Sequence, residues 1–312
     1  MMIDGVVCKQ VLNLNFKKIM IEKIISTNIS DNTTTDWTEV IEPRNNWLDL
    51  HLGELWRYRD LIMLFVWRDF VSVYKQTILG PLWHIIQPVL TTLTFYVIFG
   101  RIAQISTDGQ PPFLFYMCGI TIWNFFASAL TKTASTFTSN ASIFGKVYFP
   151  RMTVPVANVI ATFFSFGIQF ALFLCIYVGF LVAGVALKPN IYLLMLPVLL
   201  LIMSILSLAL GIILSALTTK YRDFTHLVSF GVQLLMYGSA VIYPLSMLKE
   251  ETRNWLVFNP IVPIIELFRF AFFGQGAFQW WHIMYSGVIS VVLLIFGLML
   301  FHKVEKTFMD TV

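Results

Sequence analysis

Long runs of apolar residues alternate with short charged segments along most of this chain. A helix that crosses a bilayer needs about 20 mostly apolar residues. Runs of about that length predict six membrane spans: Leu82–Phe99, Phe113 to about Phe137, Val154–Leu187, Ile191–Leu217, Phe224–Tyr243 and Ile283–Phe301. These runs are continuously apolar, whereas the strands of membrane β-barrels alternate apolar and polar residues. The predicted fold class is therefore an all-α integral membrane protein.

Two further apolar segments do not fit simple spans. Residues 46–80 place apolar side chains at near-helical spacing among charges, which predicts an amphipathic helix in the cytoplasmic interface, ended by the hinge Gly80-Pro81. Residues 255–278 contain two prolines together with Glu266 and Arg269. We expect a broken, partly re-entrant pair of short helices there, within an outer gate region at about 244–281, and a pairing of Glu266 with Arg269.

The two ends of the chain are polar. Residues 1–45 contain no apolar stretch typical of a signal peptide and predict a disordered extension. Residues 81–305 form the predicted six-span domain, and residues 306–312 a cytoplasmic tail. Lys132 falls at the inner end of the second span, where its side chain is expected to reach toward the membrane surface.

Positive charge is distributed unequally between the connections on the two sides of the predicted spans. Cytoplasmic loops usually hold the excess of Lys and Arg, so the richer side predicts cytoplasmic N- and C-termini. The richer side holds Arg57, Arg59, Arg68, Lys75, Lys146, Arg151, Lys220, Arg222, Lys303 and Lys306. The other side holds Arg101, Lys188, Lys249, Arg253 and Arg269.

Composition agrees with a membrane protein and gives no sign of nucleic-acid binding. Charged residues make up 12% of the chain, about half the share usual in soluble domains, and the net charge is only +4. Cys8, Cys118 and Cys175 lie far apart and predict neither a disulfide framework nor a metal site.

Catalytic and nucleotide-binding motifs are absent from the sequence. There is no HExxH, GxSxG or GxxxxGK[ST] pattern, and no Asp or Glu lies in the apolar cores of the six spans. We therefore expect no catalytic residues, no cofactor bound by this chain and no proton coupling. A membrane bundle of this kind needs a partner as its source of energy.

Four groups of segments resemble one known family. They are "LWRYRDLIMLFVWRDFVSVYKQTILGPLW" (55–83), "FGKVYFPRMTVP" (144–155), "TKYRDF" (219–224), and "YPLSM" (243–247) with "NPIVPIIELFR" (259–269). In this order they resemble the membrane subunits of ABC transporters that export polysaccharides, of the O-antigen and teichoic-acid class. The resemblance implies a homodimeric permease of the inner membrane with its path at the dimer interface. It also implies two copies of a separate subunit that binds ATP and Mg²⁺, and an undecaprenyl-diphosphate-linked glycan as cargo.

Four groups of candidate site residues follow from the sequence and the resemblance. Basic residues near the interfacial helix are expected to recruit the lipid diphosphate: Arg57, Arg59, Arg68 and Lys75. Aromatic residues of the second span are expected to line the glycan path: Phe113, Phe115, Tyr116, Trp123 and Phe126. Coupling to the ATP-binding subunit is expected from Phe144, Lys146, Tyr148, Arg151, Arg222 and Asp223. The outer gate is expected to contain Tyr243, Pro244, Asn259, Pro260, Glu266 and Arg269.

Other interpretations stay open at this stage. The same architecture could export teichoic acid, a capsular polysaccharide, a drug or a small lipid. A membrane-embedded transferase would need a cluster of carboxylates or histidines at one interface, and a scaffold or channel subunit would need no ATP-binding partner. A neighbouring ATPase gene among glycosyltransferase genes would favour export.

Overall fold

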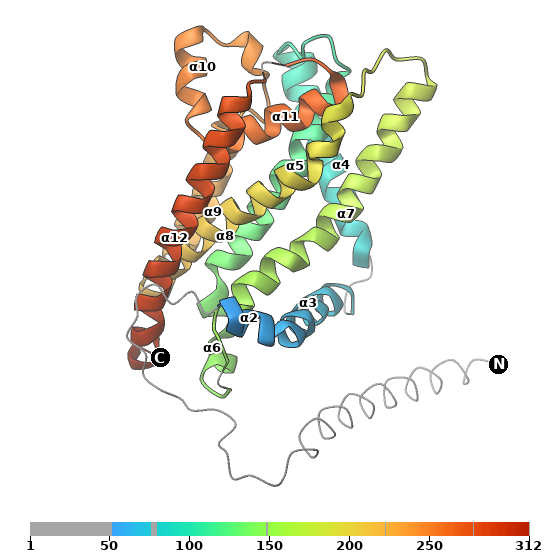
Figure 1. Ribbon diagram of the computed structural model, residues 1–312. Helices are drawn as coiled ribbons and strands as arrows, with labels where there is room; N and C mark the ends of the chain where they lie inside the picture. The colour runs from blue at the N-terminus through green and yellow to red at the C-terminus, as the bar shows by residue number, and fades with distance from the viewer. Residues whose placement is uncertain (1–51, 76–79, 148, 222, 277, 312) are drawn as a thin grey trace, which may run out of the picture. The chain divides into compact units, whose positions relative to one another are not determined.

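The computed structural model describes residues 52–75, 80–147, 149–221, 223–276 and 278–311, and these residues form helices without any strand (Figure 1). The predicted extension 1–45 lies outside the described residues. The α-helices are α2 (Leu52–Arg57), α3 (Arg59–Tyr74), α4 (Trp83–Phe95), α5 (Pro112–Ala134), α6 (Thr136–Phe144), α7 (Thr153–Val182), α8 (Leu196–Lys220), α9 (Phe224–Tyr237), α10 (Glu250–Val257), α11 (Ile261–Phe273) and α12 (Trp280–Thr311). Short 3-10 helices are η1 (Gly80–Leu82), η3 (Ile191–Met195) and η4 (Leu245–Met247), and η2 (Tyr96–Ile102) is a π-helix that continues α4.

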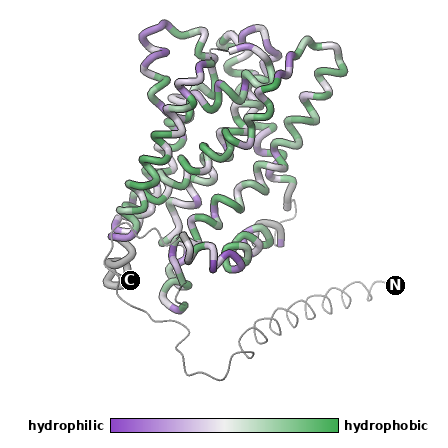
Figure 2. The backbone as a smooth tube through the Cα atoms, in the orientation of Figure 1, coloured by the Kyte–Doolittle hydropathy of each residue, from purple (hydrophilic) through white to green (hydrophobic). Residues whose placement is uncertain are grey.

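Five of the predicted spans are confirmed as helical segments of membrane length. Within the described residues they are Trp83–Ile102, Pro112–Ala134, Thr153–Val182, Ile191–Lys220 and Trp280–Lys303. Figure 2 shows hydrophobic residues along most of the length of these helices. Pro112 stands in the first turn of α5, where a missing N–H leaves no helical hydrogen bond unmade. Lys132 lies in the last turn of α5, at the end of the span where the sequence placed it.

The fifth predicted span is shorter than expected. Its helix, α9, has 14 residues, so it is about 21 Å long, which is less than the hydrocarbon thickness of a bilayer. The helix ends at Tyr237; the N–H groups of Gly238 and Ser239 still donate to carbonyl groups of its last turn, and residues 240–243 continue as a turn and bends. The side chain of Arg269 donates hydrogen bonds to the carbonyl oxygens of Ala240 and Val241. These oxygens are then not available as acceptors for a continuation of α9.

The predicted broken helix pair is present. Helices α10 and α11 meet at an angle of 105° across a short break, and together they could count as one further span. The break contains Asn259 and Pro260. The amide oxygen of Asn259 accepts a hydrogen bond from the N–H of Ile261, which satisfies a backbone donor at the start of α11.

Helix α5 lies at the centre of the hydrophobic core. It packs against α4, α7, α8 and α11, and most of its residues are buried. A Cβ atom added to Gly211 of α8 would lie 2.5 Å from the Cβ of Thr133, so glycine allows these two helices to approach closely. The central helix therefore has little surface left for lipid or cargo.

Helix α3 differs from the predicted amphipathic pattern because it is apolar on two opposite faces. Phe65 and Val66 are buried against the bundle, where α3 packs on α7. Met63, Leu64 and Trp67 on the other face are exposed. An exposed apolar face next to charged residues is typical of a helix that lies in a membrane interface. Figure 1 shows α3 and α6 at one end of the bundle, hereafter the α6 end, and α10 and α11 at the opposite end, the α11 end.

Candidate functional site

The aromatic residues predicted to line a path lie inside the single chain. Phe115, Tyr116, Trp123 and Phe126 are all buried in the core, and Phe113 is partly buried. The ring of Tyr116, for example, packs edge-on against Phe95 of α4, with 6.4 Å between centroids. Their role in a path stays a prediction, and it requires α5 to be uncovered by a change in helix packing.

Helix α4 instead carries a polar stripe on its exposed face. Gln87 and Thr94 are exposed and Thr91 is partly exposed, and their spacing places all three on one side of the helix. The hydroxyl groups of Thr91 and Thr94 donate to carbonyl groups of their own helix. The amide group of Gln87 has no hydrogen-bond partner among the described residues. A free amide is costly in hydrocarbon, so this face favours water or another chain over lipid.

Helix α9 has a second polar stripe. Only Val228 of this helix is buried. His226, Ser229 and Gln233 are exposed on one part of its free surface, whereas Leu227 and Leu234 are exposed on another. Both α4 and α9 pack against α5, so the two stripes belong to helices that flank the central one. Sequence reasoning missed these residues, although polar positions four residues apart in both segments were a usable signal.

The guanidinium group of Arg269 fixes the irregular segment that follows α9. Its Nη1 donates to the carbonyl oxygens of Ala240 at 2.7 Å and Tyr243 at 3.4 Å, and its Nη2 donates to that of Val241. The guanidinium carbon lies 3.9 Å from the centroid of the Phe115 ring. Arg269 is 2% exposed. A buried charge is tolerated here because carbonyl dipoles and an aromatic face replace its water.

Gly119 and Asn259 complete this arrangement. A Cβ atom on Gly119 would lie 2.7 Å from Nη2 of Arg269 and 3.0 Å from the carbonyl oxygen of Val241, so only glycine leaves enough room. The amide nitrogen of Asn259 donates to the carbonyl oxygen of Gly238 and to the hydroxyl of Ser239, both at 3.0 Å. The connection between α9 and α10 is thus held by two side chains from the α11 region.

The other predicted gate residues lie close to this connection. The hydroxyl of Tyr243 donates to the carbonyl oxygen of Tyr237 at 2.8 Å, and burial raises the pKa of this phenol. Pro244 is buried and Pro260 partly buried. Glu266 is buried and faces the loop after α11, since a Cβ atom on Gly276 would lie 2.8 Å from its Oε1. The predicted pairing of Glu266 with Arg269 stays a prediction.

At the α6 end, Phe144 packs inside its own chain instead of facing outward. Its ring contacts Phe137 and Phe149, each with 5.6 Å between centroids, and Phe149 contacts Phe65 of α3 at the same distance. Phe144 is thus buried in this conformation, and its predicted part in coupling to the ATP-binding subunit stays a prediction. The exposed tip after α6 is formed by Lys146 and Val147.

The remaining predicted coupling residues are only partly described. Asp223 is exposed at the connection between α8 and α9, and Arg151 is partly buried. Tyr148 and Arg222 lie outside the described residues. The connection between α6 and α7 and the connection between α8 and α9 lie at the same end of the spans, because α8 runs antiparallel to α7 (Figure 1).

The basic residues of α2 and α3 fall into two groups. Arg57, Arg59 and Lys75 are exposed. Arg68 is partly buried: its Nη2 lies 2.8 Å from Oδ1 of Asp69, and it donates to Oδ1 of Asn140 in α6 at 3.4 Å. Its guanidinium carbon also lies 4.8 Å from the Phe65 ring centroid. Arg68 therefore links α3 to α6, while the other three cations are exposed, with Nε of Arg59 3.9 Å from Oδ1 of Asp60.

Comparison with known proteins identifies the family. The pattern described as ABC-2 type transporter matches residues 60–273. The chain belongs to this family. The O-antigen export system permease protein RfbA of Klebsiella pneumoniae is 27% identical over 252 residues, which covers 80% of this chain and 94% of that protein. RfbA of Myxococcus xanthus is 27% identical over 263 residues, covering 83% and 98%. The polysialic acid transport protein KpsM of Escherichia coli is 24% identical over 246 residues, covering 78% and 93%.

Most of the features described above lie within the part of the chain that matches the ABC-2 type transporter family. The matched region begins at the first turn of α3 and ends at Phe273, the last residue of α11. It includes the Arg68 contacts, both polar stripes and the Arg269 contacts. Most of α12 lies beyond it, although α12 packs along α8.

Proposed function

We propose that this ABC-2 type transporter is the permease subunit of an exporter of O-antigen-like or capsular polysaccharide. The printed names of its relatives support this class of cargo. In our proposal, two copies of the chain work with two copies of a separate ATP-binding subunit. The complex moves a glycan linked to undecaprenyl diphosphate across the inner membrane, with the α6 end in the cytoplasm.

The observation that carries the proposal is the pair of polar stripes on α4 and α9. Each stripe is exposed in the single chain, although its helix lies among membrane spans. In a homodimer, the stripes of the two subunits would face a shared water-filled path. Amide and hydroxyl groups suit this role because a sliding sugar polymer offers hydroxyl groups along its whole length, without one fixed sequence.

The cationic residues at the α6 end suit recruitment of the lipid diphosphate, which is the first step of export in our proposal. A diphosphate at headgroup depth is a compact anion, and Arg57, Arg59 and Lys75 are exposed next to the apolar outer face of α3. Arg68 has a different part in this scheme. Its contacts hold α3 against α6. Binding of cargo at α3 would therefore move α6 and the connection between α6 and α7, where the ATP-binding subunit binds in our proposal.

Cysteine labelling in the assembled transporter tests the path. Gln87→Cys and Gln233→Cys should react with a water-soluble maleimide when ATP hydrolysis is blocked, in a background that lacks the native cysteines. Leu234→Cys is the matched control, because Leu234 lies next to Gln233 but on the apolar part of α9. Equal labelling of all three positions, or labelling of Leu234→Cys alone, would refute a path along the polar stripes.

A further inference from the structure

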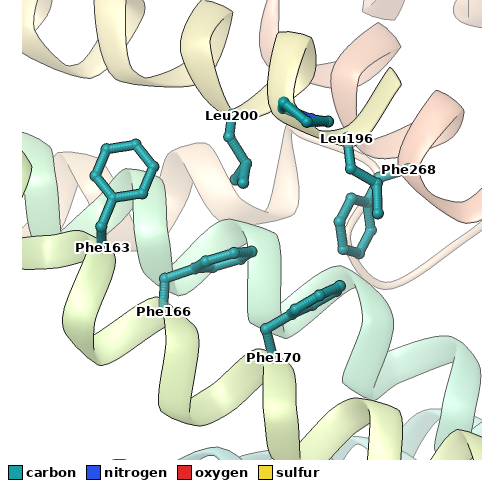
Figure 3. A pocket seen from close by; sticks show the side chains of 7 residues that line it. Phe163, Phe166, Phe170, Leu196, Leu200 and Phe268 are labelled. Carbon is teal, nitrogen blue, oxygen red and sulfur yellow. The ribbon is translucent and has the colours of Figure 1, made fainter. Parts of the chain in front are cut away.

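A cavity of about 380 Å³ lies between α7, α8 and α11. Phe163, Phe166 and Phe170 form one wall, Leu196, Pro197 and Leu200 form the second, and Phe268 closes one end. Figure 3 shows the three phenylalanines of α7 in a row, with Leu196, Leu200 and Phe268 opposite. We call this cavity the phenylalanine groove. None of the path, gate or coupling residues discussed above lines it.

The shape of the groove suits an extended apolar molecule. Phe163, Phe166 and Phe170 follow helical spacing along one side of α7, over a distance of about 10 Å. The rings of Phe166 and Phe170 stack at 5.4 Å with an interplanar angle of 13°, which gives this wall a smooth surface. Phe163 and Pro197 are exposed, so the groove opens to the surface of the chain.

The chemistry of the lining decides what can occupy this space. All seven lining side chains are apolar, and a water molecule in a cavity needs two or more polar partners. Apolar cavities of less than half this volume bind small hydrocarbons such as benzene, at about 150 Å³. An empty groove would also leave its walls without contacts on one side.

The surroundings of the groove indicate the source of the occupant. Helices α7 and α8 are membrane-length segments, and their exposed residues near the groove are apolar: Phe164, Val198 and Leu201. The medium at the mouth of the groove is therefore the hydrocarbon of the bilayer. We propose that an acyl chain of a membrane phospholipid occupies the phenylalanine groove.

Such a chain would support the helix that carries Arg269. Phe268, at the end of the groove, contacts Phe170 at 6.3 Å and Phe272 at 5.3 Å between ring centroids. Both Phe268 and Arg269 belong to α11, so the occupant would fill the space beside the helix that holds the connection between α9 and α10. This site does not depend on the cargo of the transporter, and its test needs no export.

Photolabelling with a lipid probe can test the site. The complete complex is placed in nanodiscs of phosphatidylethanolamine and phosphatidylglycerol, with a phosphatidylethanolamine whose acyl chain carries a diazirine. Mass spectrometry should find label on Phe166 and Phe268, which are 6% and 1% exposed and which bulk lipid reaches only through the groove. Label confined to exposed residues such as Leu201 would overturn the proposal.

Filling the groove provides the matched comparison. Leu200→Trp should lower labelling of Phe166 and Phe268 about tenfold, as expected if two methylene groups of the chain lose their site. Leu201→Trp adds the same ring outside the groove and should leave this labelling unchanged. Leu200→Phe, a smaller change, should give an intermediate loss if Leu200→Trp fails to assemble. Unchanged labelling in both Leu200 variants, or its displacement by a long-chain polyprenyl phosphate, would overturn a phospholipid chain as the occupant.

Discussion

The two ends of the bundle are each held by an arginine, but the two arginines bind different partners. At the α11 end, Arg269 is 2% exposed and donates to main-chain carbonyl groups of residues 240, 241 and 243. At the α6 end, the Arg68 side chain is 39% exposed and binds the side chains of Asp69 and Asn140. One arginine fixes backbone, and the other joins side chains that can rotate.

This difference indicates how each end behaves. Removing Arg269 would leave several carbonyl groups buried without donors, at about 1–3 kcal/mol each. The contacts of Arg68 are partly screened by water, and exposed ion pairs contribute only about 0–1 kcal/mol. The connection between α9 and α10 is therefore held firmly by Arg269, while the Arg68 contacts add little to the packing of Phe65 and Val66 that holds α3 on the bundle. In the proposed exporter, that contrast would suit a closed gate at the α11 end and an α6 end that responds to cargo and ATP.

The largest expected effect is that of Arg269→Met. Methionine fills part of the volume but donates no hydrogen bond, so the free energy of unfolding should fall by roughly 3 kcal/mol or more. Thermal unfolding of the purified complex and the amount of protein in membranes measure this loss. Lys249→Met removes an exposed cation at the same end and should have no such effect. An Arg269→Met variant as stable as the parent would show that the connection between α9 and α10 is not held by this side chain.

Gly119→Ala should also destabilise the α11 end, because Gly119 of α5 lies against the guanidinium group of Arg269. The added methyl group would meet Nη2 of Arg269 and the Val241 carbonyl, neither of which can move easily, and overpacking of this kind costs about 1–3 kcal/mol. Gly167→Ala is the matched control, because nothing lies within 4 Å of its Cβ position on α7. The control should be neutral or slightly stabilising, since alanine favours helix. Equal melting temperatures for the two variants would contradict the close fit around Arg269.

Sequence reasoning found five of the six predicted spans and the broken helix pair α10–α11, but it could not place individual side chains. Periodicity and length decide whether a segment crosses a membrane, and both are visible in the sequence. Arg269 was recognised as unusual, yet its partners are carbonyl groups some 26 to 29 residues away, which no side-chain pattern reveals. The burial of the aromatic residues of α5 could not be predicted, because apolar composition is the same for a path, a lipid face and a core. Burial of α5 depends on the neighbouring helices.

Arg68→Gln measures how much the Arg68 contacts contribute to stability at the α6 end. Loss of the contacts to Asp69 and Asn140 should lower the free energy of unfolding by about 1 kcal/mol or less, because these groups are partly exposed. Hydrogen exchange of α3 amides should become faster, while exchange in α11 stays unchanged. Arg57→Gln, at an exposed position, serves as the control. Faster exchange in α11 would mean that the two ends are not independent.

The smallest effect on stability is expected for Val147→Asp, at the exposed tip after α6. Val147 is 58% exposed, so a carboxylate there costs little in the isolated permease, within about 0.5 kcal/mol. In the proposed complex this tip meets the ATP-binding subunit, where a buried, unpaired charge is unfavourable. Val147→Asp should therefore lower cargo-stimulated ATP hydrolysis while leaving the melting temperature of the permease unchanged. Val147→Ile keeps the apolar surface and should retain stimulation. If Val147→Asp is fully stimulated, the contact with the ATP-binding subunit lies elsewhere. The buried Phe144 cluster, which contacts Phe65 of α3 and, through Phe137, Phe301 of α12, then has a structural role only.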